Sequence, residues 1–254
     1  MPDDGSLFRQ LRAAPLAYGC WRLAGSEGQP PEPTAAPGIR AVLAALEAGY
    51  QVFDLADIYA GGRAEEIFGA ALRESPGARS RILVAGKCGI RRAGDPDPAA
   101  PYRYDFSAAH LERSVEGSLR RMGLDHLDLL LLHRPDYLMD PAAVAGVFSR
   151  LRDSGKVRGF GVSNFRPGQA DLLQRACPFP LLVHQVEISL CQRQALDDGT
   201  LDQCLAAGWV PQAWSPLARG LLPSGRAAGM DPADAPRWAA LAAELERLAA
   251  AHGV

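Results

Sequence analysis

Short apolar runs alternate with helical stretches through most of this sequence, and the alternation restricts the fold more than any other feature. The stretches between the runs, such as residues 38–49 (GIRAVLAALEAG) and 109–123 (AHLERSVEGSLRRMG), have helical spacing. A repeat of strand and helix is typical of a parallel sheet. The expected strands are residues 15–20, 51–56, 81–87, 127–133, 157–163, 181–187 and 209–214.

Residues at the ends of the helical stretches agree with this repeat. Gly49 and Gly123 follow helical stretches closely, as glycines at helix carboxyl ends do. Asp105 or Ser107 is placed to cap the helix that begins near His110.

Polar side chains stand where the apolar runs end. Asp54 and Tyr59 follow one run, Lys87 the next and His133 another. Because the carboxyl ends of parallel strands meet at one rim, we expect these four side chains to form one site. An open doubly wound sheet would concentrate its site at one crevice, whereas candidate residues follow at least six of the seven expected strands. The pattern therefore predicts a single α/β domain over residues 1–254, a (β/α)8 TIM barrel that lacks its last strand and helix.

Composition narrows the class of protein. The chain has 254 residues, 48% of them hydrophobic, and its formal net charge of -2 gives no bulk electrostatic reason to expect nucleic acid or an anionic membrane as partner. No apolar run reaches about 18 residues, and the amino terminus lacks the basic start of a secretion signal. Five scattered cysteines suit reduced thiols. We expect a soluble, cytoplasmic protein with a small-molecule partner; nothing in the pattern selects an oligomeric state.

Three long irregular stretches follow strand ends and would stand over the rim. Loops of this length are uncommon unless they are disordered or functional, so they can shape a substrate pocket. The rim loops carry Trp21, Arg22, Tyr102 and Tyr104, from which no sequence rule derives a particular substrate. The three stretches are residues 25–38, 91–105 and 219–236.

The four strand-end residues have complementary chemistry. A phenol with a pKa of about 10 is a poor acid at neutral pH, but a neighbouring ammonium such as Lys87 favours its ionised form and lowers that pKa. Tyr59 would then deliver a proton, and Asp54 would pair with Lys87 to keep it charged and oriented. His133 would hydrogen-bond to the oxygen of a bound carbonyl. Together these roles predict reduction of a carbonyl.

Four motifs resemble, in order and spacing, those of the aldo-keto reductase family. They are FDLADIY-x-x-G-x-x-E-x-x-x-G from Phe53, the ILVAGK run that ends at Lys87, LDHLDLLLLHRPD from Leu124 and GKVRGFGVSNF from Gly155. Members of this family are NAD(P)H-dependent (β/α)8 barrels. The resemblance, which runs from about residue 19 to residue 220, implies an oxidoreductase that reduces an aldehyde or ketone to an alcohol by hydride transfer from NADPH or NADH.

The resemblance also assigns roles to single residues. The family's catalytic tetrad matches Asp54, Tyr59, Lys87 and His133, with Tyr59 as the general acid. The positions that bind the nicotinamide match Ser163, Asn164 and Gln185 for the carboxamide and Trp214 for stacking on the ring. The remaining positions are Ser215 and Leu217 near the pyrophosphate, and Cys20 and Trp21 beside the nicotinamide and substrate.

Two departures from the family pattern stand out. The family usually has Asn before the later Gln, where this chain has His184 and keeps Gln185. Family barrels also continue into an eighth strand and helix whose loop grips the adenosine 2′-phosphate, whereas here a stretch with helical spacing ends at Val254. A seven-stranded remnant would expose two long hydrophobic sheet edges, so we expect a tail beyond Val254 rather than a truncated protein.

Rival chemistries have weaker support in the sequence. GFGVSN lacks the third glycine of a dinucleotide-binding loop, no GxSxG is present, and the five histidines show no metal-ligand spacing, so we expect no metal. Lys87 would suit a Schiff-base lyase, although Asp54 would raise its pKa. The remaining alternative is a dinucleotide-binding regulatory or sensor subunit with little turnover, against which the complete tetrad argues.

Overall fold

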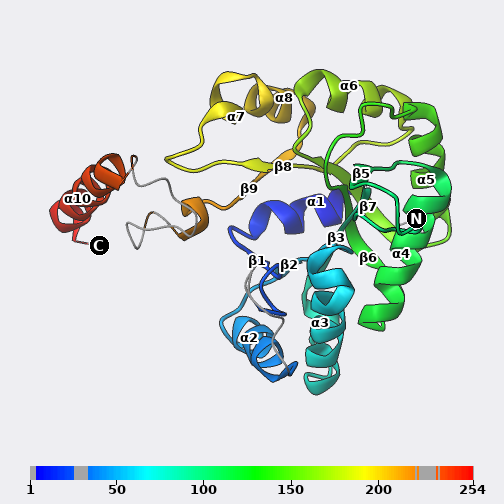
Figure 1. Ribbon diagram of the computed structural model, residues 1–254, viewed down its shortest axis with the longest axis horizontal. Helices are drawn as coiled ribbons and strands as arrows, with labels where there is room; N and C mark the ends of the chain where they lie inside the picture. Colours follow the sequence, from blue (N-terminus) through cyan, green and yellow to red (C-terminus); the bar gives the residue numbers. More distant parts are fainter. Residues whose placement is uncertain (1–3, 26–33, 221, 223–232, 234, 254) are drawn as a thin grey trace.

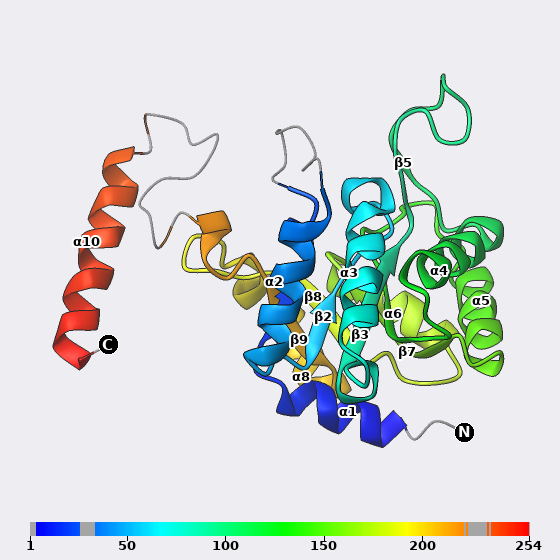
Figure 2. The same cartoon turned by 90° about the horizontal axis from the view of Figure 1, so that it is seen from below.

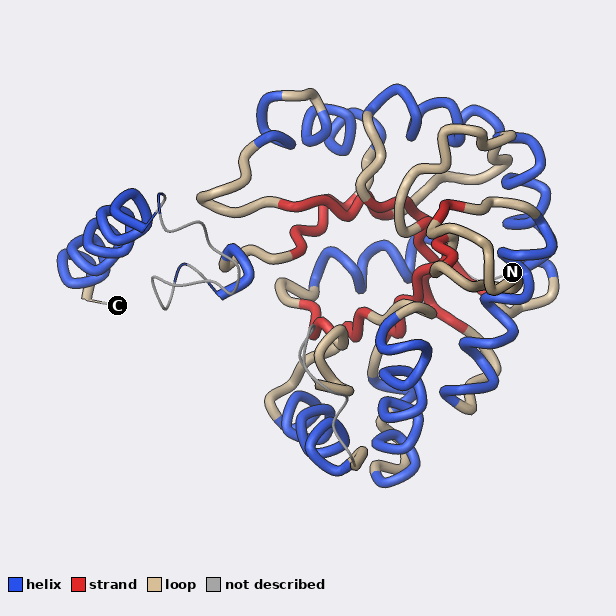
Figure 3. Tube along the Cα trace, in the orientation of Figure 1, coloured by secondary structure: helices blue, strands red, loops and turns tan. Residues whose placement is uncertain are grey.

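The computed structural model describes residues 4–25, 34–220, 222, 233 and 235–253. Its main element is a seven-stranded sheet in the order β1-β2-β3-β6-β7-β8-β9, in which all neighbouring strands are parallel. The strands curl into an arc that is open between β1 and β9 (Figure 3). The α/β pattern of the sequence is thereby confirmed, and the described residues form a half-barrel.

The elements occupy the following ranges. The strands are β1 (Ala17–Gly19), β2 (Val52–Asp54), β3 (Leu83–Cys88), β4 (Ile90–Arg91), β5 (Arg103–Tyr104), β6 (Leu127–Leu132), β7 (Val157–Ser163), β8 (Val183–Glu187) and β9 (Val210–Trp214). The helices are α1 (Asp4–Ala13), α2 (Ala36–Glu47), α3 (Arg63–Glu74), α4 (Ala108–Met122), α5 (Pro141–Asp153), α6 (Pro167–Ala176), α7 (Gln194–Asp197), α8 (Thr200–Ala207) and α10 (Ala235–His252). Short 3-10 turns are η1 (Tyr59–Gly62), η2 (Arg79–Arg81) and η3 (Ala218–Gly220).

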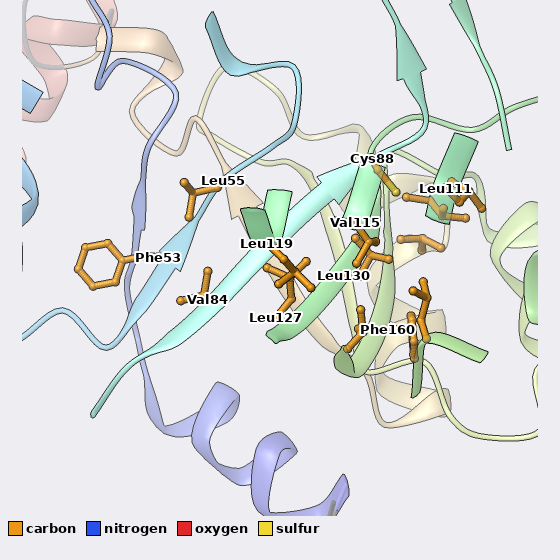
Figure 4. Packing of buried hydrophobic residues seen from close by; sticks show 14 of the residues in the cluster. Phe53, Leu55, Val84, Cys88, Leu111, Val115, Leu119, Leu127, Leu130 and Phe160 are labelled. Carbon is orange, nitrogen blue, oxygen red and sulfur yellow. The ribbon is translucent and has the colours of Figure 1, made fainter. Parts of the chain in front are cut away.

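Helices pack on the outer face of the sheet, and the main core lies between the two layers (Figure 1). Every residue of β3 and β6 is buried, as expected for central strands covered on both faces. Phe148 on α5 stacks on Phe160 of β7, with ring centroids 4.2 Å apart. Leu127 and Leu130 of β6 reach the same core (Figure 4).

The helix α1, which the strand pattern did not predict, closes the amino-terminal end of the barrel. Its Leu7 and Leu11 are buried in a second core with Leu83, Leu129 and residues that begin other strands. Figure 2 shows α1 beneath the strands, on the side opposite the long loop of the β4–β5 hairpin. The inside of the barrel is therefore apolar at its base and open at the carboxyl-terminal rim.

The expected irregular stretches have different outcomes. Residues 91–105 are framed by the antiparallel pair β4 and β5, which pairs Ile90 with Tyr104. Much of the other two stretches lies outside the described residues, at 26–33, 221, 223–232 and 234. The stretch with helical spacing that ends the sequence forms α10, which stands apart from the sheet in Figures 1 and 2 and buries none of its residues.

The expected helix ends are largely confirmed. Ser107 caps α4, where its side chain accepts a hydrogen bond from the backbone N–H of His110, and Gly123 ends the same helix in the left-handed conformation.

In the described part of the chain, no strand follows β9. None of the described helices is long and apolar enough to cross a membrane.

Gly161 in β7 offers a test of the packing between the strands. A Cβ at this position would lie 2.4 Å from the carbonyl oxygen of Val183 and 2.7 Å from a methyl group of Leu131, whereas a Cβ at Gly168 in α6 would meet nothing within 4 Å. We expect Gly161→Ala to lower the free energy of unfolding by about 1–3 kcal/mol through overpacking. Gly168→Ala should leave it unchanged or raise it. Urea unfolding of both variants measures the difference, and equal midpoints would contradict this packing.

Candidate active site

The tetrad residues expected at the strand ends come together at the carboxyl-terminal rim. Asp54 is the last residue of β2, Lys87 lies near the end of β3, and His133 directly follows β6. The backbone N–H of His133 donates to the carbonyl oxygen of Cys88, which continues the β3–β6 pairing to the rim. Parallel register thus places at one edge residues that are far apart in the sequence.

Tyr59 is positioned by a tight turn immediately after β2. Its backbone N–H donates to the carbonyl oxygen of Ala56, and the next residues, Ala60 and Gly61, have φ values of 48° and 68°. Gly62 follows with a φ of 93° and precedes α3. Three consecutive left-handed residues turn the chain away from the rim and leave the Tyr59 ring facing Lys87. The glycines are suited to this path because they adopt positive φ without steric cost.

Lys87 joins two members of the tetrad directly. Its Nζ atom lies 2.6 Å from Oδ2 of Asp54, 3.0 Å from the carbonyl oxygen of Leu55 and 3.1 Å from the hydroxyl oxygen of Tyr59. The Lys87 side chain is 1% exposed, and these three acceptors match the three protons of its ammonium group. A buried ammonium held in this way is charged and directional.

The pKa values show how the site holds its protons. Burial opposes the charged form of Lys87, but the Asp54 carboxylate and the Tyr59 oxygen outweigh burial and raise the pKa of this ammonium. The Lys87 ammonium lowers the pKa of Tyr59, as expected, but the net change in this pKa is upward. Burial raises the pKa of the Tyr59 phenol more than the ammonium lowers it. Tyr59 therefore keeps its proton at neutral pH.

His133 stands on the other side of Tyr59. The two rings make an edge contact, with centroids 5.8 Å apart and planes at 80°. Burial, together with the charges of Lys87 and Arg134, lowers the pKa of His133 to about 2, so its imidazole is neutral. Nδ1 is buried without a hydrogen-bond partner among the described residues. A neutral imidazole here can donate a hydrogen bond to a substrate oxygen without adding charge.

The side chains expected at the nicotinamide also meet at the rim. The Asn164 amide donates to the carbonyl oxygen of His133 at 3.0 Å, and its oxygen accepts from Nε1 of Trp214 at 2.9 Å. Asn164 has a φ of 61°, so a left-handed backbone directs its side chain between β6 and β9. Gln185 donates to Oδ1 of Asp54 at 3.2 Å. The amide cluster and the tetrad are thus one hydrogen-bonded network.

Gln212 belongs to this network, and the sequence analysis missed it. Gln212 in β9 is opposite Gln185 in β8, and its side-chain oxygen accepts a hydrogen bond of 2.6 Å from the Gln185 amide. Gln185 is in turn opposite Ser163 in β7. The position of Gln212 two residues before Trp214 could have indicated from the sequence that it belongs to the site. Residues two apart in a strand share a face, so both point to the interior.

A cavity of about 820 Å³ connects these groups. It reaches from the rim to Leu11 at the base. Cys20 and Leu217 do not line it: Cys20 is fully buried beside it, and Leu217 is 58% exposed on the rim. The sequence-predicted residues that line it are Trp21, Asp54, Tyr59, His133, Ser163, Asn164, Gln185, Trp214 and Ser215.

The cavity lining fits a nicotinamide cofactor. Trp214 offers a flat aromatic ring, and Ser163 and Gln185 place polar side-chain atoms beside it. These groups suit the aromatic ring and carboxamide of a nicotinamide. In the described part of the chain, no three His, Cys, Asp or Glu side chains are grouped so that they could hold a metal ion.

The likeness to known proteins agrees with this geometry. The sequence matches the Aldo/keto reductase family over residues 15–254. The chain belongs to the aldo-keto reductase family. It is 40% identical over 225 residues to a 6-dehydroglucose reductase of Agrobacterium fabrum, covering 88% of this chain and 74% of that protein. It is 46% identical over 177 residues to oxidoreductase YdhF of Escherichia coli, covering 70% of this chain but only 59% of that protein.

Solved structures give the same result for the fold. A glycerol dehydrogenase from Gluconobacter oxydans superposes with a TM-score of 0.81 at 30% sequence identity, covering 93% of this chain and 74% of that one. This aldo-keto reductase chain therefore has the family's α/β barrel architecture in its described strands.

Asp57, between Asp54 and Tyr59, is a half-buried acid with a buried Oδ1 atom, and the sequence analysis also missed it. Its Oδ2 accepts a hydrogen bond from the Ser114 hydroxyl of α4, while its Oδ1 has no hydrogen-bond partner among the described residues. The Asp57 N–H donates to the carbonyl oxygen of Lys87 at 3.1 Å. Burial raises the pKa of the Asp57 carboxyl to about 7, although the Ser114 hydrogen bond opposes this.

This raised pKa predicts a pH-dependent stability. Between pH of about 4 and 7 the unfolded chain has lost the Asp57 proton and the folded chain has kept it, so the free energy of unfolding falls as pH rises. The stabilisation that the protonated Asp57 carboxyl gives the folded state is fully present below about pH 4 and is lost near pH 7. Asp57→Asn removes the titration, so the variant should gain a few kcal/mol relative to the parent across this window. Urea unfolding from pH 4 to 8 measures this gain, with exposed Asp153→Asn as control; parallel curves for Asp57→Asn and the parent would contradict the burial argument.

Proposed function

We propose that this chain reduces an aldehyde or ketone to an alcohol with NADPH, or with NADH, and that Tyr59 is the general acid. The observation that carries the proposal is the contact of Lys87 with both Asp54 and the Tyr59 hydroxyl. Family membership and relatives named as reductases support carbonyl reduction. We further propose that residues 1–254 belong to one barrel domain that works in the cytoplasm.

Each member of the tetrad has a separate task in this proposal. When bound, the cofactor supplies a hydride, which forms the new C–H bond at the carbonyl carbon and brings two electrons. Tyr59 gives its proton to the carbonyl oxygen, so that the product is a neutral alcohol. The Lys87 ammonium stabilises the phenolate that remains, and Asp54 keeps Lys87 charged and oriented.

His133 and the amide network set the position of the reacting groups. The neutral imidazole of His133 donates to the same carbonyl oxygen and holds it near Tyr59. Ser163, Asn164 and Gln185, which line the cavity, would hold the nicotinamide carboxamide, and Trp214 would stack on the ring. Ser215, Trp21 and the exposed rim residue Leu217 complete the proposed cofactor contacts, whereas Cys20 is fully buried and does not line the cavity. Fixed geometry of this kind lowers the entropic part of the barrier.

The ion pair also argues against a Schiff-base lyase. An amine nucleophile must lose its proton, and Lys87 has a raised pKa because Asp54 and Tyr59 surround its ammonium. A regulatory subunit that binds the dinucleotide would need no proton donor beside a buried ammonium. Turnover, measured as the loss of absorbance of the reduced cofactor, separates a sensor from a reductase.

Tyr59→Phe is the direct test of the proposed general acid. Loss of the hydroxyl should lower kcat by about 10²–10⁴-fold, the usual contribution of a positioned proton donor, while leaving cofactor affinity within a factor of a few. Tyr50→Phe is the matched control, because Tyr50 packs against Tyr18 outside the cavity. Full turnover by Tyr59→Phe would refute the assigned mechanism.

Fluorescence tests the nicotinamide site separately from turnover. The chain has four tryptophans, and Trp214 is the one expected to stack on the cofactor. Titration with NADPH and with NADH should quench emission, and Trp214→Phe should remove most of the quenching. Trp238→Phe on α10 serves as the control and should retain it. Quenching that survives Trp214→Phe would place the cofactor elsewhere.

A further inference from the structure

Three arginines from three different loops face the cavity around Tyr59. Arg22 follows β1, Arg92 follows β4, and Arg134 follows His133 at the end of β6. Arg92 reaches the residue beside the proton donor, since its guanidinium donates to the backbone oxygen of Ile58. These three positive charges and Tyr59 therefore line the same cavity.

No carboxylate in the described part of the chain pairs with these three arginines. The guanidinium of Arg22 lies over the Trp21 ring, 5.6 Å from its centroid, and that of Arg134 lies 5.6 Å from the centroid of Trp214. Several arginines elsewhere in the fold do have acidic partners. Among these pairs are Arg91 with Asp105 at 2.6 Å, Arg121 with Glu65 at 2.6 Å and Arg158 with Asp128 at 2.8 Å.

The cavity is consequently positive although the whole chain is slightly acidic. Asp54 is the only carboxylate among the described residues that line it, and Lys87 neutralises that charge. The formal net charge of the chain is -2. Charges of one sign in a cleft with low-dielectric walls raise the local concentration of ions of the opposite sign and speed their association.

The cofactor phosphates do not account for all of this charge. A fourth arginine, Arg219, lies on the rim after β9, 5.8 Å from the centroid of Trp214, where the proposed pyrophosphate contacts also lie. Arg22 and Arg92 line the cavity at other residues, beside Trp21 and Ile58. They are placed to meet the part of a substrate that extends away from the nicotinamide.

We infer, on the basis of the reductase function proposed above, that the substrate is a carbonyl compound bearing a carboxylate or similar anionic group, held by Arg22, Arg92 and Arg134. The planar guanidinium binds a carboxylate through two parallel hydrogen bonds, which orients the substrate as well as attracting it. The contacts with Trp21 and Ile58 hold two of the guanidiniums in place before binding. The aldehyde in the name of the relative, 6-dehydroglucose, carries no ionised group, so the inference separates this chain from that relative.

A matched pair of aldehydes tests the inference. 4-Carboxybenzaldehyde and methyl 4-formylbenzoate have similar size and differ in charge. We expect kcat/KM for the carboxylate to exceed that for the ester by at least 10-fold at low salt, and the ratio to fall with added salt. In Arg22→Gln, Arg92→Gln and Arg134→Gln the ratio should fall toward one. Substitution of the same three arginines by lysine, which retains the positive charge, should preserve part of the ratio. Arg120→Gln, on the exposed face of α4, is the control of equal charge change.

A binding measurement separates this inference from the proposed function. Calorimetric titration of the full chain with terephthalate, which cannot be reduced under these conditions, should show binding that each glutamine variant weakens at least 5-fold and Arg120→Gln does not. NADPH affinity measured in parallel shows whether an arginine serves the cofactor instead. Equal kcat/KM for the two aldehydes would overturn the inference and leave the reductase standing. Terephthalate binding without turnover of any aldehyde would support the anion site and refute the reductase, and the absence of both would overturn both.

Discussion

The contact of the buried Lys87 ammonium with Asp54 and Tyr59 is the constraint on which the rest of the site depends. Removing two charges from water costs several kcal/mol for each ion, and only close hydrogen-bonded pairing offsets that cost. The pairing requires the end of β2, the end of β3 and the turn at Tyr59 to be held at one place. The parallel register between β2 and β3 and the left-handed turn after Tyr59 meet this requirement.

Burial has two opposite consequences around this ion pair. It raises the pKa of the Tyr59 phenol, which therefore keeps its proton, and it lowers the pKa of His133, which therefore stays neutral. The site thus holds one positive charge, one negative charge and two neutral groups that can donate to an oxygen. An arrangement of this kind stabilises negative charge that develops on a carbonyl oxygen.

The two ends of the barrel have different roles: the base is packed with apolar side chains, and the rim carries the loops that line the cavity. At the base, α1 places Leu7 and Leu11 against the residues that begin the strands, which makes the lower interior apolar. At the rim, loops carry the arginines and aromatic rings that a substrate would meet. Packing at one end gives the rigidity that fixed catalytic geometry at the other end requires.

The sequence by itself determined the strand and helix repeat, the seven strands and the tetrad, because apolar runs ending in Asp54, Lys87 and His133 have a local signature that parallel strands convert into one rim. Only the tertiary structure showed the net direction of the Tyr59 pKa, the role of Gln212 and the burial of Asp57. The physical reason is that desolvation and register depend on which elements cover a side chain, and residues from distant parts of the chain decide that. The same holds for the charge of the cavity, because Arg22, Arg92 and Arg134 meet only once the barrel has formed.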